Sequence, residues 1–216
     1  MAIARRISVF LPAYNEEGNL ERSVADIVWA AERVTGEYEI LIVNDGSTDR
    51  TGELAERPGD EAKLDHFSFL AADGEIARDS VRDIFAAVGR ADIVVPYHQN
   101  PRARQFHRRF LTWASTALVN RLFGLRMHYY QGPGIYPVAL ARSLPKTAGG
   151  FYFLTQMLIH AIHAGSSYVE VGLTHVDRTH GRSKAVSIKN ILKALRAIGQ
   201  TWWTIHVRHE LVARRT

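Results

Sequence analysis

The chain has 216 residues, of which 46% are hydrophobic and 23% are charged, and its formal net charge at pH 7 is +5. This length and composition suit a globular chain of one domain, or one domain with a short appendage. The lack of cysteine excludes disulfide bonds and thiolate metal sites, and the lack of a signal-peptide segment or of about 18 consecutive apolar residues predicts a cytoplasmic protein without a transmembrane helix.

The apolar pattern predicts strands and helices that alternate over most of the chain. Short apolar, β-branched runs are typical of buried strands, and apolar residues at helical spacing are typical of amphipathic helices. In chain order, the predicted elements are strand 7–11, helix 19–34, strand 39–44, helix 48–57, strand 67–70, helix 80–88, strand 91–96, helices 105–123 and 149–163, strand 168–173 and helix 187–205. Asn19 is expected to cap the first helix, and Ser47 or Thr48 the second. This order predicts an α/β fold with a mainly parallel central sheet flanked by helices.

Polar segments follow three of the predicted strands, at the point where each strand ends. They are residues 12–16 (PAYNE), 44–47 (NDGS) and 73–75 (DGE). Because open α/β sheets bind ligands at the carboxyl ends of their strands, we expect these segments to form one site. Their carboxylates suit a metal ion or ribose hydroxyls, and their turn amides suit an anion. The plain alternative is that the second segment is only a turn and helix cap, because Asp-Gly and Ser-Thr are common turn residues.

The first two segments resemble the opening of family 2 glycosyltransferases. The resemblance lies in residues 8–17 (SVFLPAYNEE) and 41–51 (LIVNDGSTDRT). It implies the GT-A nucleotide-diphospho-sugar transferase fold and an inverting transfer from a UDP- or GDP-linked sugar. It further implies that Pro12, Ala13, Tyr14 and Glu16 line the nucleotide pocket, with Asp45 on the base or ribose and Ser47 nearby.

The resemblance also implies an acidic metal motif, commonly Asp-x-Asp with a further polar ligand two residues on. The matching positions are Ala71, Asp73 and Glu75, so the first acid is absent. A hard divalent cation takes the rest of its oxygen ligands from diphosphate and water. Asp73 and Glu75 are therefore expected to hold Mg²⁺ or Mn²⁺, more weakly, with Asp73 in a catalytic role. The alternative is that they form a turn and the first acid of a helix.

Residues 168–172 and 177–184 resemble the closing strand and the Arg-x-x-Gly-x-Ser-Lys segment of the polyisoprenyl-phosphate branch of the family, the branch of the dolichyl-phosphate mannose synthases. Arg178 and Lys184 are expected to act in catalysis, because their fixed charges suit phosphate oxygens. Ser183 is assigned to the acceptor phosphate. A basic surface loop that leads into a helix cap is the alternative.

A basic segment, residues 102–110, opens the long helix and matches the part of that branch that receives the lipid phosphate. Arg108 and Arg109 are assigned to the acceptor phosphate. The interleaved Phe106, Phe110 and Trp113 belong either to the core or to a contact with a lipid chain or the membrane interface.

The charge is unevenly distributed, and its basic half points to anionic partners. Residues 1–99 hold 10 Lys or Arg and 19 Asp or Glu, whereas residues 100–216 hold 17 and 3. The anions would be phosphates, a lipid surface or nucleic acid. Residues 1–186 are predicted to form the GT-A-like domain, and residues 187–216 a basic amphipathic helix at the membrane surface. The chain would then be peripheral at the cytoplasmic membrane face, alone or with a separate membrane subunit.

The chain departs from the family pattern in three places. Between Asp45 and Asp73 the family usually has an additional strand and helix with a donor loop, but here the interval holds one predicted helix and the loop 58–63. Either this branch is shortened or the sequence lacks a segment, and the donor-sugar contacts of this interval are not assigned. The stretch that begins at His128 lacks the acid expected before a Gly-Phe-Arg-like turn, and Gln156 stands where a helical acid is expected. A phosphate acceptor is already an anionic nucleophile and needs little help from a base, so these losses favour a lipid-phosphate acceptor.

Transfer of a sugar from a nucleotide-sugar donor to a polyisoprenyl phosphate is therefore the function that the sequence favours. Two alternatives stay open. One is a degenerate member that binds a nucleotide without turnover, as Ala71 and the shortened interval would allow. The other is a basic nucleic-acid-binding module, against which stands the lack of any recognisable nucleic-acid-binding motif; no specific nucleic acid is expected. Ten histidines offer no metal site at recognisable spacing.

Overall fold

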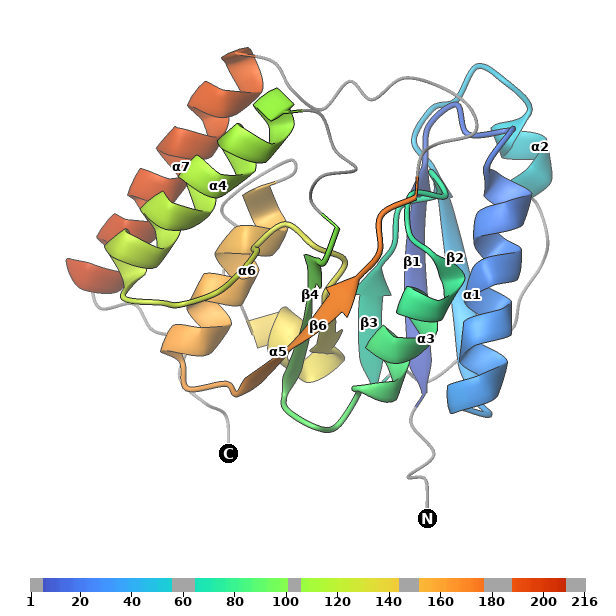
Figure 1. The fold of residues 1–216 in the computed structure, drawn as a ribbon, viewed down its shortest axis with the longest axis horizontal. Helices are drawn as coiled ribbons and strands as arrows, with labels where there is room; N and C mark the ends of the chain where they lie inside the picture. The colour runs from blue at the N-terminus through green and yellow to red at the C-terminus, as the bar shows by residue number, and fades with distance from the viewer. Residues whose placement is uncertain (1–5, 56–64, 101–105, 144–151, 177–187, 209–216) are drawn as a thin grey trace.

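The computed structural model describes residues 6–55, 65–100, 106–143, 152–176 and 188–208. Figure 1 shows a single sheet with helices on both sides. The strands are β1 (Ile7–Ala13), β2 (Tyr38–Asn44), β3 (His66–Phe69), β4 (Ile93–His98), β5 (Ile135–Pro137) and β6 (Tyr168–Leu173). The helices are α1 (Leu20–Val34), α2 (Thr51–Ala55), α3 (Arg78–Ala86), α4 (Phe106–Phe123), α5 (Val138–Ser143), α6 (Tyr152–His163) and α7 (Ile188–His206).

The six strands are arranged in the order β2-β1-β3-β5-β4-β6. Pairing is parallel between β1 and both of its neighbours and between β4 and β6, whereas β5 runs antiparallel to β3 and β4. The predicted α/β class with a mainly parallel sheet is thus confirmed. β5 and the short helix α5 were not predicted, because three residues ending in Pro137 carry too little pattern to indicate a strand.

The core has two parts, one on each face of the sheet. On one face, Val9 and Leu11 of β1 pack with α1 and α3. On the other, Ile93 and Val95 of β4 pack with α4, α6 and α7. Successive side chains of a strand point to opposite faces of the sheet. β4 therefore contributes to both clusters, with Val94 in the first and Ile93 and Val95 in the second. The helices that bear the basic half of the sequence therefore lie together, away from α1 and α3 (Figure 1).

The sheet ends at β2 within the described residues, as the shortened interval after Asp45 leads one to expect. Leu41 and Val43 of β2 are 43% and 39% exposed, although parallel strands are usually covered on both faces. Only α2 is described between β2 and β3. Residues 56–64, which complete this interval, lie outside the described residues.

Asn19 occupies the N-cap position of α1, as predicted, whereas Ser47 and Thr48 do not cap α2. Asn19 precedes α1, but its side chain makes no cap hydrogen bond; its amide donates to Glu16 Oε2 at 2.7 Å. The second helix begins at Thr51 rather than at residue 48, and Asp49 Oδ1 accepts the Thr51 N–H at 3.0 Å. The Asn19 side chain instead bonds Glu16 in the loop after β1, and Ser47 and Thr48 bond Asn15 in the same loop.

Helix α7 contributes Ala197, Ile198 and Ile205 to the second core cluster, which joins it to the sheet domain through α4 and α6. The division at residue 187 stays a prediction. Among the helices of the described residues, none has both the length and the apolar character that a bilayer crossing requires.

Acid is expected to destabilise the protein through histidines of α6. His160 is 1% exposed, and neither of its ring nitrogens has a hydrogen-bond partner within the described chain. Burial, and then the neighbouring His163, lower the pKa of His160 below 6.5; burial and His206 lower the pKa of His163. The unfolded chain therefore binds protons that the folded protein excludes, so stability falls as the pH drops below about 6.5.

Urea denaturation at several pH values checks this expectation. The midpoint should stay level above about pH 7 and fall between roughly pH 6.5 and 5, and His160→Leu should make that fall shallower. An equal fall in the variant and the parent would contradict a role for His160.

Candidate active site

The ends of β1, β2 and β3 meet at the upper edge of the sheet in Figure 1. β1 is paired with β2 up to Ala13 and Asn44, and the Asp45 N–H then donates to the Ala13 carbonyl at 2.9 Å. On the other side of β1, the Leu70 N–H donates to the Phe10 carbonyl, which brings the end of β3 alongside. The prediction that the three polar segments gather at one edge is therefore confirmed.

Side chains join the loop that follows β1 to the loop that follows β2. Ser47 Oγ accepts the Asn15 N–H at 3.0 Å, and Asn15 Oδ1 accepts the Thr48 N–H at 2.8 Å. Asn15 has a φ of +54°, a left-handed conformation that asparagine tolerates better than most residues. Asn15 is therefore the residue that shapes the first loop around the second.

Further hydrogen bonds extend this junction toward α2. Thr51 Oγ1 accepts the Glu16 N–H at 2.8 Å, and Glu17 Oε2 accepts the Arg50 N–H at 3.0 Å. Asp49 Oδ2 accepts the Glu17 N–H at 3.3 Å. Partial desolvation acts to raise the pKa of Asp49, but hydrogen bonds from Thr51 and Glu17 hold it below its usual value. We call residues 12–17 and 44–51 the paired loops.

The paired loops leave the groups assigned to the nucleotide accessible. Tyr14 is 48% exposed, and Pro12 and Asp45 are also exposed, whereas Ala13 is buried. Asn44 Oδ1 accepts the Ser47 N–H at 2.9 Å around Gly46, whose φ is +76°. Residues 44–47 therefore form a turn, as the plain alternative predicted. The same turn presents the Asp45 carboxylate, which can accept hydrogen bonds from a base or ribose.

Asn15→Ala is expected to destabilise the protein by about 1–2 kcal/mol, because it removes the bond to Thr48 and places alanine at a positive φ. Asn15→Gly loses the same bond without the conformational cost and should be less affected. Urea denaturation of the parent, Asn15→Ala and Asn15→Gly measures the effect of the lost hydrogen bond and that of the backbone conformation separately. Alanine and glycine variants as stable as the parent would show that this junction contributes nothing.

The acidic turn after β3 is tied to β6. Asp73 Oδ1 accepts the Glu75 N–H at 3.2 Å. The Glu75 carbonyl in turn accepts the Val176 N–H at 2.8 Å, and the Ala77 N–H donates to the Thr174 carbonyl at 3.1 Å. Two strands that are not neighbours in the sheet, β3 and β6, are therefore linked across this edge by residues 73–77 and 174–176.

The two acids fit a cation that is shared with a diphosphate. Asp73 and Glu75 lie on one turn and are both partly exposed, whereas Ala71 offers no ligand. Within the described ranges, no three His, Asp or Glu side chains are placed to hold a metal ion by themselves. Such a cation would have to take most of its ligands from a bound diphosphate and water, as Mg²⁺ commonly does.

Sequence reasoning missed two histidines beside this turn. His175 Nδ1 lies 3.8 Å from Glu75 Oε2, and its side chain is 8% exposed. Asn100 holds the His175 backbone with both amide atoms, at 2.9 and 2.8 Å, and the His98 ring meets the His175 ring edge-on. His98 ends β4 and His175 follows β6, so the rule that pointed to the carboxyl ends of the first three strands also points to these two residues.

The residues assigned to the acceptor lie mostly beyond what the structure describes. Arg109 lies on α4, on the opposite side of the sheet from α1, and is partly exposed. Arg108 belongs to the same helix, but its side chain is outside the description. Arg178, Ser183 and Lys184 also fall outside the described residues. Their assigned roles therefore stay predictions.

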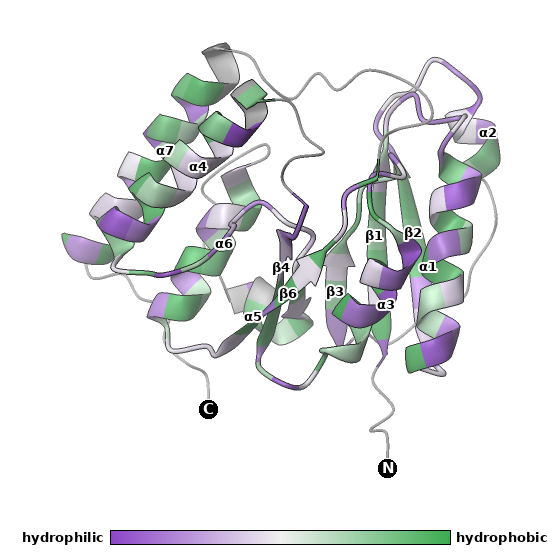
Figure 2. Ribbon diagram, viewed as in Figure 1, coloured by the Kyte–Doolittle hydropathy of each residue, from purple (hydrophilic) through white to green (hydrophobic). Residues whose placement is uncertain are grey.

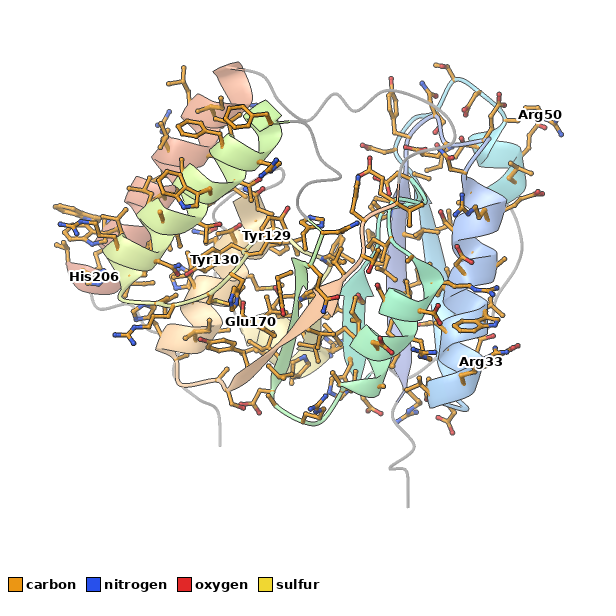
Figure 3. The ribbon with its side chains drawn as sticks, viewed as in Figure 1. Arg33, Arg50, Tyr129, Tyr130, Glu170 and His206 are labelled. Atoms are coloured by element: carbon orange, nitrogen blue, oxygen red, sulfur yellow. The ribbon has the colours of Figure 1, made fainter. Side chains whose placement is uncertain are left out.

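Glu170 contacts the stretch 128–134, in which the sequence lacks the acid that the family pattern leads one to expect. Glu170 of β6 accepts the His128 N–H at 2.8 Å and contacts His128 Nδ1 at 2.9 Å (Figure 3 labels Glu170). Tyr97 stacks on the His128 ring with centroids 4.8 Å apart. Glu170 of β6 is thus a carboxylate that contacts the first residue of the stretch 128–134. Gln156 is 3% exposed within α6.

Comparison with known proteins agrees with this geometry. Residues 8–58 match the sequence model of glycosyl transferase family 2. A dodecaprenyl-phosphate galacturonate synthase of Rhizobium johnstonii is 24% identical over 82% of this chain and 61% of its own length. An undecaprenyl-phosphate 4-deoxy-4-formamido-L-arabinose transferase of Edwardsiella ictaluri is 26% identical over 82% and 62%. This chain therefore spans about three fifths of each of these two proteins.

A third relative is matched over most of its length. An undecaprenyl-phosphate mannosyltransferase of Micrococcus luteus is 24% identical over 83% of this chain and 87% of its own. Among solved structures, glucosyl-3-phosphoglycerate synthase from Mycobacterium tuberculosis, in complex with Mg²⁺ and UDP, superposes with a TM-score of 0.66 at 21% identity, over 90% of this chain and 80% of that one. Residues 8–58 thus carry the signature of family 2 glycosyltransferases, and the chain has the GT-A fold.

Proposed function

We propose that the protein transfers a sugar from a UDP- or GDP-linked donor to a polyisoprenyl phosphate, with inversion at the anomeric carbon. The observation that carries the proposal is the sheet edge at which the paired loops and the Asp73–Glu75 turn follow the ends of the adjacent strands β1, β2 and β3. It combines an exposed carboxylate for a nucleoside with two carboxylates suited to a metal–diphosphate. The relatives' names join a polyprenyl phosphate to a sugar, which supports the acceptor class.

The residues divide the work between binding and charge stabilisation. Tyr14 and Asp45 would hold the nucleoside, and Ser47 keeps the first loop in place through its bond to Asn15. Asp73 and Glu75 would hold Mg²⁺ or Mn²⁺ against the diphosphate, where the cation neutralises charge on the leaving group. Complexes of the M. tuberculosis synthase contain UDP with either metal, which supports this arrangement.

The acceptor supplies its own nucleophile. A phosphate oxygen attacks the anomeric carbon as the bond from that carbon to the diphosphate breaks, and the nucleoside diphosphate leaves. No proton has to be removed, because the phosphate is already ionised. The buried amide of Gln156, which cannot act as a base, is compatible with such an acceptor. Arg109, with Arg108, Arg178, Ser183 and Lys184, would pair with the acceptor phosphate.

A polyisoprenyl chain is held in a bilayer, so we place the reaction at the cytoplasmic membrane face. The direct test incubates the purified protein and Mn²⁺ with undecaprenyl phosphate and a panel of UDP- and GDP-sugars, and follows labelled sugar into the lipid fraction. Transfer from one donor is the expected result. No transfer from any donor would overturn the proposed activity.

A nucleotide-binding protein without turnover is the second candidate, and Ala71 favours it. That protein would bind UDP or GDP at the same edge and transfer nothing, even after Ala71→Asp. The two candidates therefore differ in the transfer assay and agree in nucleotide binding.

A further inference from the structure

Exposed apolar side chains gather on two helices, α4 and α7. Most of the large hydrophobic residues that are exposed in the described part of the chain lie there, and few lie elsewhere. They are Phe106, Phe110 and Trp113 on α4, at 55–78% exposure, and Ile191, Leu192, Leu195, Trp202 and Trp203 on α7, at 37–62%. We call this set the two-helix face. Eight such residues on two neighbouring helices differ from the singly scattered apolar residues of an ordinary surface.

The two helices lie side by side and have apolar residues on both sides. Ser115 and Val119 of α4 line one small cleft together with Ala194 and Ile198 of α7. Beneath, Phe123, Ile198 and Ile205 belong to the second core cluster. Figure 2 shows apolar residues along both helices. A helix that packs on a core usually turns polar residues outward, so the outer face of this pair is unusual for a surface in water.

The outer residues of each helix form a stripe. Phe106, Phe110 and Trp113 follow at spacings of four and three, and the rings of Phe110 and Trp113 are 6.1 Å apart. On α7, Trp202 stacks on His206 with centroids 5.1 Å apart, at the far end of the helix (Figure 3 labels His206). The aromatic residues are therefore spread along the pair rather than gathered at one point.

The charge on these helices has one sign. Neither α4 nor α7 contains an aspartate or glutamate. Lys193, Arg196 and Arg121 are exposed, and Arg109 is partly exposed. None of the ion pairs between described residues involves these four cations. An apolar aromatic stripe flanked by unpaired cations suits a surface that is apolar inside and anionic at its boundary.

A bilayer fits this description better than a second copy does. Two copies joined through this face would bring together two surfaces that each carry Lys193, Arg196 and Arg121, with no acid on α4 or α7 to balance them. Tryptophan is favoured at the boundary between lipid headgroups and acyl chains, and basic residues are attracted to anionic lipids. In-plane helices with this composition bind membranes.

We infer that the two-helix face docks on an anionic lipid bilayer. Both helices begin at the edge of the molecule where the paired loops lie (Figure 1). The docking itself does not rest on the proposed function.

Tryptophan fluorescence tests the docking without any acceptor or donor. The chain has four tryptophans; three lie on the two-helix face, and Trp29 lies on α1, where Arg33 covers its ring at 4.1 Å. In Trp29→Phe, the emission should shift to the blue with phosphatidylcholine–phosphatidylglycerol vesicles and be quenched by brominated acyl chains. Pure phosphatidylcholine vesicles and high salt should both weaken binding, because they remove the electrostatic attraction.

The double variant Trp113→Ser, Leu192→Ser should weaken vesicle binding by roughly 100-fold, because it removes two exposed apolar anchors. Leu41→Ser is the matched control, since Leu41 is a similarly exposed apolar residue on β2; it should bind as the parent does. Circular dichroism confirms that each variant is folded.

Three results would overturn the inference. They are absence of vesicle binding by the parent, equal binding by the double variant, and a concentration-dependent dimer in vesicle-free solution that the double variant abolishes. Because the vesicles contain no polyisoprenyl phosphate, docking without later sugar transfer would count against the proposed function alone.

Discussion

Asp73→Asn is expected to reduce sugar transfer by roughly 100-fold, because it removes the charge that would hold the cation against the donor diphosphate. The substitution keeps the size of the side chain and leaves Oδ1 able to accept the Glu75 N–H. The loss should therefore appear in kcat and in Mn²⁺ affinity rather than in stability. Initial rates of transfer and a titration with Mn²⁺ in the presence of UDP measure both.

Asp83→Asn is the matched control. Asp83 is an exposed acid on α3 whose partner is Arg82, at 2.7 Å. A surface ion pair of this kind contributes little to stability, about 0–1 kcal/mol, and the control should transfer sugar at the parental rate. If Asp73→Asn also keeps the parental rate, the acidic turn is a structural turn and the metal assignment is wrong.

Ala71→Asp is expected to tighten Mn²⁺ binding in the presence of UDP by about tenfold, because a third carboxylate joins the turn. Ala71 is exposed, so the longer side chain can be accommodated.

The outcome of Ala71→Asp also separates the two candidate functions. Tighter metal binding with faster transfer supports an enzyme whose metal site is weak. Tighter binding without any transfer supports a nucleotide-binding protein without turnover. An unchanged metal affinity would mean that position 71 does not face the metal, which contradicts a cation site formed by positions 71, 73 and 75.

The alternation of strands and helices could be predicted because its periodicities are strong. The β6 bounds agree with the predicted strand 168–173, and α1 and α4 differ from their predictions by one residue at the start. Parallel pairing then brings strand ends together, so the gathering of the polar segments followed from the strand order alone. These features depend on local pattern and on a general rule for open sheets.

The parts that escaped prediction depend on contacts between distant residues. Glu170 and His128 are 42 residues apart in the sequence, and neither pattern nor spacing relates them. The bonds of Asn15 to Ser47 and Thr48 likewise join separate loops. On α4, apolar residues line two sides of the helix, so periodicity could not tell Phe106, which is exposed, from Phe123, which is buried.

Calorimetric titration with UDP and with GDP, each with and without Mn²⁺, decides whether the edge formed by the paired loops and the Asp73–Glu75 turn is a nucleotide-diphosphate site. Binding of one nucleotide that strengthens with Mn²⁺ and weakens in Asp73→Asn is the predicted result. Failure of both nucleotides to bind, with or without metal, would contradict the site and reduce the relationship to one of fold.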